Sequence, residues 1–223
     1  MRSRLLAEGL GTGLLLYVVV GSGIAAERLG RDGGTQLFMH AVIVGLGLAA
    51  LIAMFQIISG SHFNPAVTLA FWRTGNISPG EALGYVATQL AGAVLGVIAA
   101  NLTFGGAAVA VSETVRSGPG LVTAEAIGTF VLVLSILLLV DTARAALVPA
   151  VVGAWVAAIV FATASTGFAN PAVTAARVFT DTYTGIAPAS VLAFVAAQLL
   201  AGLLAALTVP VLLPRPVPVE TTT

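Results

Sequence analysis

The sequence predicts an all-α membrane protein with six transmembrane helices, two re-entrant half-helices and two inverted repeats. Three observations lead to this fold class. The 223-residue chain is 58% hydrophobic and 8% charged, with a mean hydropathy of +1.06, which is far too apolar for a soluble domain. It contains six apolar runs of bilayer-spanning length. The pentapeptide Asn-Pro-Ala-Val-Thr occurs twice, at residues 64–68 and 170–174.

The composition also excludes several classes of function. The nine basic residues, all arginine, balance nine acidic residues, so the formal net charge of zero gives no reason to expect a nucleic-acid partner. The chain has no cysteine, which rules out disulfides, thiolate metal sites and a cysteine nucleophile. With two histidines and no paired acids at catalytic spacing, we expect no enzyme activity, no metal and no cofactor.

Apolar runs of about 20 residues mark the spans. In chain order they are Leu5–Ala26, Thr35–Ile58, Glu81–Phe104, Leu121–Val140, Leu147–Ser165 and Pro188–Leu213. Six spans place both termini on one side, and five arginines lie on that side against three on the other. The positive-inside rule favours cytoplasmic termini, and we expect a multi-pass protein of a bacterial inner (cell) membrane. The proline-rich end, residues 214–223, is expected to be disordered.

Each copy of the pentapeptide follows an apolar run and opens a segment too short to cross a bilayer. An Asn-Pro pair is a helix-start signal, because proline presets φ at the first helical position, where its missing N–H costs nothing. We therefore expect short helices to begin at Pro65 and Pro171. In an apolar chain, such half-helices are tolerated only where they are buried in protein or line a water-filled cavity. Asn64 and Asn170 would each present an amide there, beside a positive helix end.

The two halves of the chain repeat beyond the pentapeptides. The matching segments are residues 7–12 (AEGLGT) with 124–129 (AEAIGT), and 89–92 (QLAG) with 198–202 (QLLAG). We therefore predict a single membrane domain over residues 1–223, with repeats at approximately 5–104 and 121–213. Because each repeat has three spans, the second runs through the membrane upside down, and the half-helices come in from opposite faces.

Each repeat also carries one intramembrane carboxylate, Glu8 in the first and Glu125 in the second. Such a group is costly and is a functional-site candidate by default. A proton relay would need a titrating partner at similar depth, and the sequence offers none apart from His62. We therefore predict that each glutamate accepts hydrogen bonds from backbone N–H groups in the loop before the half-helix, which would otherwise be unpaired in a dry interior.

Two Asn-Pro-Ala boxes, Asn64-Pro65-Ala66 and Asn170-Pro171-Ala172, in a six-span chain resemble the aquaporin/glycerol-facilitator (major intrinsic protein) family over essentially the whole chain. The resemblance implies an aquaporin-like passive channel for small neutral solutes in the lipid bilayer, assembled as a homotetramer with one pore per subunit. It implies the same loop-supporting role for Glu8 and Glu125. It also implies that His62 lines the pore as a fixed hydrogen-bonding group. A metal site at His62 is not expected, because the sequence has no second His, Cys or carboxylate at ligand spacing.

The sequence departs from the family at Val173. The residue after the second box is usually an arginine that forms one wall of the narrowest constriction. Arg177 lies one helical turn further along and is a candidate to reach the lumen, a question that the sequence leaves open. Losing the arginine at Val173 removes the fixed donor that narrows and polarises the constriction, which argues against strict water selectivity.

The other constriction positions follow from spacing. They are Val44 on the second span and Phe168 or Gly167 before the second box. The fifth-span position is Ile159, with Ala158 or Val160 as alternatives, because the loop is one or two residues shorter than usual. A water-selective filter in the family resembles Phe, His and Arg around a small polar loop residue, and this chain matches none of the first three.

These features favour a passive channel wider than a strict water channel. Candidate solutes are glycerol, urea, boric acid, arsenite and methylated arsenicals, with water as well. An outlying group of relatives found with arsenic-resistance systems resembles this chain in carrying valine after the second box. The alternatives are a water-selective aquaporin, an ion-coupled secondary transporter of a small solute, and a nonconducting protein of the same fold.

Overall fold

The computed structural model describes residues 1–213, so the predicted disordered end, 214–223, lies outside the described residues. Within residues 1–213 the structure is helical and contains no β-strand. The long helices are α1 (Arg2–Leu29), α2 (Gly33–Ser59), α4 (Pro79–Thr103), α5 (Pro119–Asp141), α6 (Val148–Ala162) and α8 (Pro188–Leu212). The short elements are α3 (Pro65–Arg73), α7 (Pro171–Ala176) and two 3-10 turns, η1 (Ala145–Leu147) and η2 (Arg177–Phe179).

Six helical segments are long and apolar enough to cross a membrane, which confirms the predicted number of spans. The fifth span ends earlier than predicted. The sequence predicts Leu147–Ser165, whereas α6 ends at Ala162. The reason is that residues 163–169 form the irregular loop leading to the second half-helix, in which the backbone of Thr166 is left-handed, with φ of 61°.

The two short helices begin at Pro65 and Pro171, as the sequence predicts. In each, the preceding asparagine is the N-cap, and its side-chain oxygen accepts a hydrogen bond from the backbone N–H of Ala66 or Ala172, at 2.9 Å in both cases. Each residue of the Asn-Pro pair therefore stabilises the start of its helix in a different way. Proline sets φ at the first position, and asparagine pairs an N–H that the helix itself leaves open.

Glycines allow α1 and α4 to cross at close range. Gly92 and Gly96 of α4 lie against Gly9 and Gly13 of α1. A Cβ atom added at Gly92 would lie 2.0 Å from the Gly9 carbonyl oxygen, and one at Gly96 would lie 2.0 Å from the Gly13 carbonyl oxygen. The small residues spaced one turn apart therefore pack helices within one chain, which brings the walls of the bundle together around its centre.

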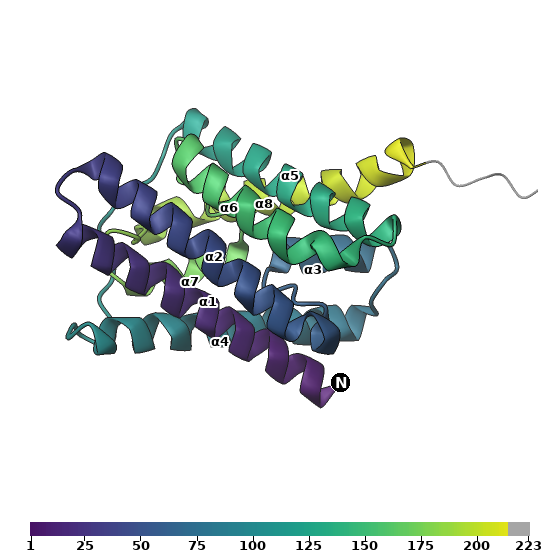
Figure 1. Ribbon diagram of the computed structural model, residues 1–223, viewed down its shortest axis with the longest axis horizontal. Coiled ribbons are helices and arrows are strands. Elements are labelled where there is room, and N and C mark those ends of the chain that lie inside the picture. Colours follow the sequence, from purple (N-terminus) through teal and green to yellow (C-terminus); the bar gives the residue numbers. More distant parts are fainter. Residues whose placement is uncertain (214–223) are drawn as a thin grey trace, which may run out of the picture.

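The arrangement of the half-helices is inverted (Figure 1). The N-terminus and the end of α8 lie at the same end of the bundle. Helix α3 lies between the long helices on the side of the termini, and α7 lies on the opposite side. Because each begins at its asparagine cap, the two half-helices start near the middle of the bundle and run outward in opposite directions.

Candidate functional site

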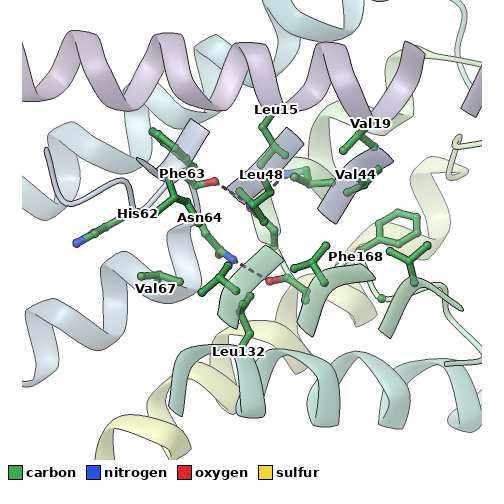
Figure 2. A pocket seen from close by; sticks show the side chains of 18 of the residues that line it. Leu15, Val19, Val44, Leu48, His62, Phe63, Asn64, Val67, Leu132 and Phe168 are labelled. Carbon is green, nitrogen blue, oxygen red and sulfur yellow. Dashed lines mark hydrogen bonds between the residues drawn. The ribbon is translucent and has the colours of Figure 1, made fainter. Parts of the chain in front are cut away.

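A narrow cavity of about 70 Å³ lies inside the bundle. Its walls come from α1, α2, α5 and α6, from the half-helices α3 and α7 with the turn η2, and from the loops that precede both half-helices. The volume counts the space that the centre of a water-sized sphere can occupy. One water needs about 10–15 Å³ of such space, so the cavity has room for roughly five to seven waters. His62 and Phe168 lie toward opposite ends of it, with Asn64 between them (Figure 2).

Asn64 and Asn170 meet at the centre of the cavity, and each binds the opposite repeat. The Asn64 amide nitrogen Nδ2 donates to the carbonyl oxygen of Ala169 at 2.8 Å. The Asn170 Nδ2 donates to the carbonyl oxygen of Phe63 at 2.7 Å. A carboxamide nitrogen carries two N–H donors, so this exchange leaves one N–H of each asparagine for a molecule in the cavity.

The acceptors of these two bonds are held in unusual backbone conformations. Phe63 and Ala169 have φ of 47° and 49°, in the left-handed region that non-glycine residues rarely occupy. Each such residue costs on the order of 1–3 kcal/mol unless its surroundings hold it in place. Since each carbonyl accepts from the asparagine of the other repeat, the strained backbone is part of how the two boxes meet.

Glu8 of α1 is fully buried and holds the first box loop. Its Oε1 accepts from the Ser59 hydroxyl at 2.6 Å and from the His62 backbone N–H at 2.9 Å. Its Oε2 accepts from the Phe63 backbone N–H at 2.7 Å and from the Gln89 side-chain amide at 2.8 Å. The carboxylate thus pairs two backbone donors of an irregular loop that has no ladder of its own.

Glu125 of α5 does the same in the second repeat and is also fully buried. It accepts from the backbone N–H groups of Phe168 at 2.9 Å and Ala169 at 2.8 Å. The Gln198 amide nitrogen donates to it at 2.6 Å. These are the contacts that the sequence analysis expects of an intramembrane glutamate with a supporting role.

Two glutamines and two threonines that were not predicted as site residues complete these two networks. Gln89 donates to the hydroxyl of Thr68 at 3.0 Å, and Gln198 donates to that of Thr174 at 2.9 Å. All four side chains are fully buried. The signal was present, because each threonine is the last residue of a pentapeptide and the two glutamines open the other matching segments.

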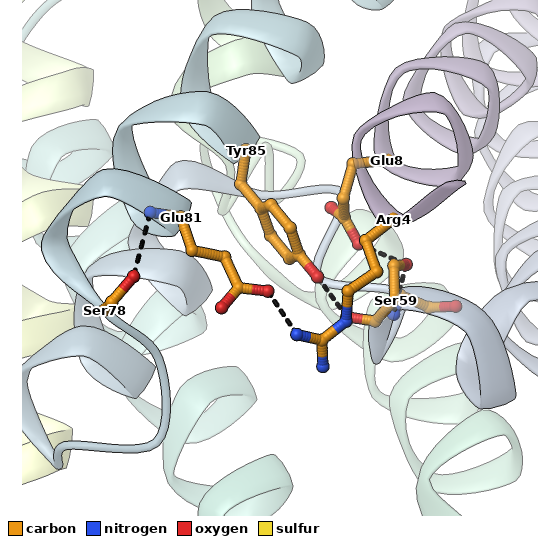
Figure 3. A network of polar contacts seen from close by, with 7 residues as sticks. Arg4, Glu8, Ser59, Ser78, Glu81 and Tyr85 are labelled. Atoms are coloured by element: carbon orange, nitrogen blue, oxygen red, sulfur yellow. Dashed lines mark hydrogen bonds and ion pairs between the residues drawn. The ribbon is translucent and has the colours of Figure 1, made fainter. Parts of the chain in front are cut away.

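The end of the bundle near the first box is tied together from several helices (Figure 3). Arg4 of α1 forms an ion pair with Glu81 of α4. The Tyr85 hydroxyl donates to the Ser59 carbonyl oxygen at 2.8 Å, which anchors the end of α2 beside Glu8. The loop that carries His62 is therefore held by α1, α2 and α4 together.

His62 lines the cavity and is 7% exposed. Its ring nitrogen Nδ1 lies 3.1 Å from the Thr68 hydroxyl oxygen, and its ring packs near those of Phe71 and Tyr85, with centres 4.5 and 5.2 Å away. Within residues 1–213, no group of three His, Cys, Asp or Glu side chains could hold a metal ion. The geometry is that of a fixed polar group in the wall.

Three of the predicted constriction residues, Val44, Phe168 and Val173, line the cavity. Each is at most 6% exposed. Phe168 is held edge-on against the ring of Phe194 on α8, with ring centres 5.4 Å apart. The wall next to the second box is therefore largely apolar on the α2 side and on the half-helix side.

Ile159, one of three residues that the sequence leaves open for the fifth-span constriction, is buried and is not among the residues that line the cavity. Its side chain fills the space beside Gly167, where an added Cβ atom would lie 2.6 Å from Ile159 Cγ1, and it also reaches Gly128. The next residue, Val160, is the α6 residue that lines the cavity at this position, and Gly167 lines it as well.

Arg177, whose reach the sequence leaves open, is among the residues that line the cavity. It lies in η2, just beyond the end of α7, and is 3% exposed. Its Nε–H donates to the Thr184 carbonyl oxygen, and its guanidinium carbon lies 3.4 Å from the centre of the Phe168 ring. The side chain is therefore clamped between a backbone carbonyl and an aromatic face.

His40 also lines the cavity and was not predicted from the sequence. It lies on α2, one helical turn before Val44, and is 4% exposed. Its Nδ1 lies 2.8 Å from the Ser22 hydroxyl oxygen, and its ring meets that of Tyr183 edge-on, with centres 5.8 Å apart. Burial raises the pKa of the Tyr183 hydroxyl, so this neighbour stays neutral. The signal was its spacing from Val44, since residues four apart share a helix face.

Comparisons with known proteins agree with this architecture. The family model described as major intrinsic protein matches residues 1–169, which include the first box and stop just before the second. The aquaglyceroporin AqpS of Rhizobium meliloti (strain 1021) is 43% identical over 197 residues, covering 88% of this chain and 84% of that protein. The glycerol uptake facilitator protein of Escherichia coli (strain K12) is 36% identical over 105 residues, covering 47% of this chain and 36% of that protein.

Among solved structures, the X-ray structure of the aquaglyceroporin from Plasmodium falciparum matches with a TM-score of 0.74. The match covers 93% of this chain and 94% of that one at 20% identity, and it shows a shared fold. The six apolar helices and the family match show an integral, multi-pass membrane protein. The family model spans most of the chain, and a relative at 43% identity spans nearly all of it. The chain therefore belongs to the major intrinsic protein family.

Proposed function

We propose that the protein is a passive channel for small uncharged solutes larger than water, and that it passes water as well. Candidate solutes are glycerol, urea and neutral metalloid hydroxides such as boric acid, arsenite and methylated arsenicals. The observation that carries the proposal is the valine wall beside the second box, formed by Val44, Val160 and Val173. The three isopropyl groups have no hydrogen-bond donor that would hold water in the constriction. The barrier for a larger, less polar solute is therefore lower than it would be with an arginine at this position.

The relatives support a channel rather than an enzyme. Two of them are named an aquaglyceroporin and a glycerol uptake facilitator. A solute that enters the cavity exchanges its bulk hydrogen bonds for the free N–H groups of Asn64 and Asn170 at the centre, which offsets a desolvation cost of several kcal/mol. The apolar remainder of the wall accepts the carbon skeleton of a polyol.

The hydrogen bonds of the buried glutamates argue against an ion-coupled transporter. Such a protein needs an acid at its substrate site that can take up and release a cation. In residues 1–213 the cavity wall contains no carboxylate, and both oxygens of Glu8 and of Glu125 are engaged by loop and glutamine donors. These two groups hold the loops in place and lie outside the solute path.

The charges that do line the cavity are positive. Arg177 is buried there, and two helix N-termini add positive dipole ends at the centre. A wall of this sign repels cations, protons included, and admits neutral molecules. The proposed channel therefore excludes cations at its centre and near Arg177. At the valines it admits neutral solutes larger than water.

The repeats, the assembly and the topology complete the proposal. The matching glutamate, glutamine and threonine networks support one channel domain made of repeats at 5–104 and 121–213. The family resemblance supports a homotetramer with one pore per subunit. The arginine distribution and a bacterial relative support a bacterial inner membrane with cytoplasmic termini.

The test is stopped-flow flux into proteoliposomes that contain the purified protein, compared with empty liposomes. The solute panel is water, glycerol, urea, arsenite and a methylated arsenical, each measured with and without a pH or sodium gradient. We expect glycerol and at least one metalloid to cross faster than in empty liposomes, independently of any ion gradient. Flux of water alone would establish the water-selective alternative, and flux that needs an ion gradient would establish the transporter.

A further inference from the structure

His40 and Arg177 each lie one helical turn from a predicted constriction residue. His40 precedes Val44 by one turn on α2, and Arg177 follows Val173 by one turn beyond the start of α7. Helix α2 runs toward the first box, whereas α7 runs away from the second. Both displacements therefore lead in the same direction, toward the mouth opposite the chain termini (Figure 1). Both side chains line the cavity.

One loop segment, Tyr183 and Thr184, brings the two side chains together. The His40 ring meets the Tyr183 ring with centres 5.8 Å apart, and the carbonyl oxygen of Thr184 accepts from Arg177 Nε–H. Arg116 is tied to the same segment, because its Nη2 donates to the Tyr183 carbonyl oxygen at 3.2 Å. The three basic side chains thus contact the same loop segment, and two of them, His40 and Arg177, line the cavity beside it.

The contacts of His40 select one tautomer of its ring. The Ser22 hydroxyl donates to the Val19 carbonyl oxygen at 3.1 Å and lies 2.8 Å from His40 Nδ1. A hydroxyl has one proton, so both hydrogen bonds form together only if Nδ1 carries the ring proton and donates to the Ser22 oxygen. The neutral ring then has a lone pair on Nε2. In the part of the chain that the structure describes, no side chain or backbone N–H binds this nitrogen.

Arg177 supplies the complementary group. Its Nε–H is used by Thr184 and one face is covered by Phe168, whereas its terminal nitrogens have no hydrogen-bond partner among residues 1–213. No carboxylate in that range forms an ion pair with it. A guanidinium held by its Nε and its face is fixed in orientation, and its remaining N–H groups are donors only.

We infer that His40 and Arg177 form a second, polar constriction outside the valine wall and that His40 determines specificity there. His40 Nε2 accepts a hydrogen bond from a solute O–H or N–H group, while Arg177 donates to a solute oxygen. The ligand class is a small neutral molecule that carries both a donor and an acceptor, as polyols, neutral hydroxides and urea do. The inference rests on the proposed function, because it assigns a specificity residue to the same pore.

A matched pair of substitutions separates the chemistry of His40 from its size. His40→Gln keeps an acceptor oxygen, and His40→Leu replaces it with a side chain of similar length and no polar atom. In proteoliposomes we expect glycerol flux through His40→Leu to fall about three- to tenfold, the effect of one lost hydrogen bond on a barrier. His40→Gln should stay within about twofold of the parent, and water flux should change less than glycerol flux in both variants.

Ser22→Ala tests the positioning role, because Ser22 does not line the cavity. Without the hydroxyl the ring loses the partner that fixes its tautomer, so glycerol flux should fall to a level between the parent and His40→Leu. If His40→Leu does not insert into membranes, His40→Met is measured in its place as the side chain without an acceptor nitrogen or oxygen.

The outcomes distinguish this inference from the proposed function. Equal glycerol flux in His40→Leu and His40→Gln, in a parent that conducts glycerol, overturns the role of His40 and leaves the channel proposal standing. A parent that passes water and no larger solute overturns both. A parent that conducts glycerol, with Gln well above Leu, supports both.

Discussion

Replacing a buried glutamate should damage the fold in proportion to the donors that it leaves unpaired. Glu125→Ala removes the acceptor of the Phe168 and Ala169 backbone N–H groups. At about 1–3 kcal/mol for each buried unpaired donor, the two together cost about 2–6 kcal/mol. The Gln198 amide also loses one of its two acceptors and keeps only Thr174, and the truncation leaves a cavity, so the total approaches the whole stability of many domains, about 5–15 kcal/mol.

Glu125→Gln should be milder. A glutamine keeps one acceptor oxygen, so one of the two backbone donors stays paired and the other faces an NH2 group, at a cost of about 1–3 kcal/mol. Gln198 can turn its own amide to offer oxygen to the new NH2 group. The same order, with alanine worse than glutamine, should hold at Glu8, whose carboxylate also binds two loop N–H groups.

The assay is thermal unfolding of the detergent-solubilised protein, followed by tryptophan fluorescence. Trp155 is a suitable reporter of the second repeat, because its indole N–H donates to the Gly128 carbonyl oxygen on α5 at 3.0 Å. Glu27→Ala, at an exposed position of α1, is the control and should cost less than about 0.5 kcal/mol. Equal loss in Glu125→Ala and Glu125→Gln would refute the loop-supporting role. So would abolished transport in Glu125→Gln if parent transport follows a pH gradient.

Three further substitutions test the pore and its walls. Asn170→Asp loses the NH2 donors and adds a negative charge, so solute flux should fall more than about tenfold, and unchanged flux in a folded variant would remove the box from the mechanism. Val173→Arg places a second guanidinium one turn from Arg177, and the ratio of glycerol to water flux should drop; an unchanged ratio would show that this position does not limit the solute. Gly92→Ala puts a Cβ atom against the α1 backbone and should lower the free energy of unfolding by about 1–3 kcal/mol or more. Gly80→Ala on the same helix is the control, because its Cβ atom meets open space. Equal melting temperatures of the two variants would contradict the close crossing of α1 and α4.

Much of this fold could be predicted because its signals are long or doubled. Six apolar runs set the spans, and proline after asparagine set the starts of both half-helices at Pro65 and Pro171. The buried glutamates were accessible to reasoning because a charge in an apolar span needs partners, and irregular backbone supplies donors. These inferences needed only the kind of residue and its place in a repeat.

The walls of the pore were harder to predict, because they depend on helix phase. Neighbouring helical residues differ by about 100° in direction, so a shift of one residue exchanges Ile159, which packs on glycines, for Val160, which lines the cavity. The loop before the second box fixes that phase, and its left-handed residues leave no periodic signal. His40 was missed although it lies four residues before Val44, because an apolar span without a polar face does not by itself show which side chains face the centre.

The crossed hydrogen bonds of the asparagines have a consequence for how the protein is made. Asn64 binds a residue 105 positions later, and Asn170 binds one 107 positions earlier. When the first three spans leave the ribosome, the partner of Asn64 has not yet been synthesised. The first half therefore enters the membrane with an unfinished lining, which only the arrival of the second half completes. Maturation of the pore is thus a late event in biogenesis, and two half-chains produced separately should regain it only after they meet in the same bilayer.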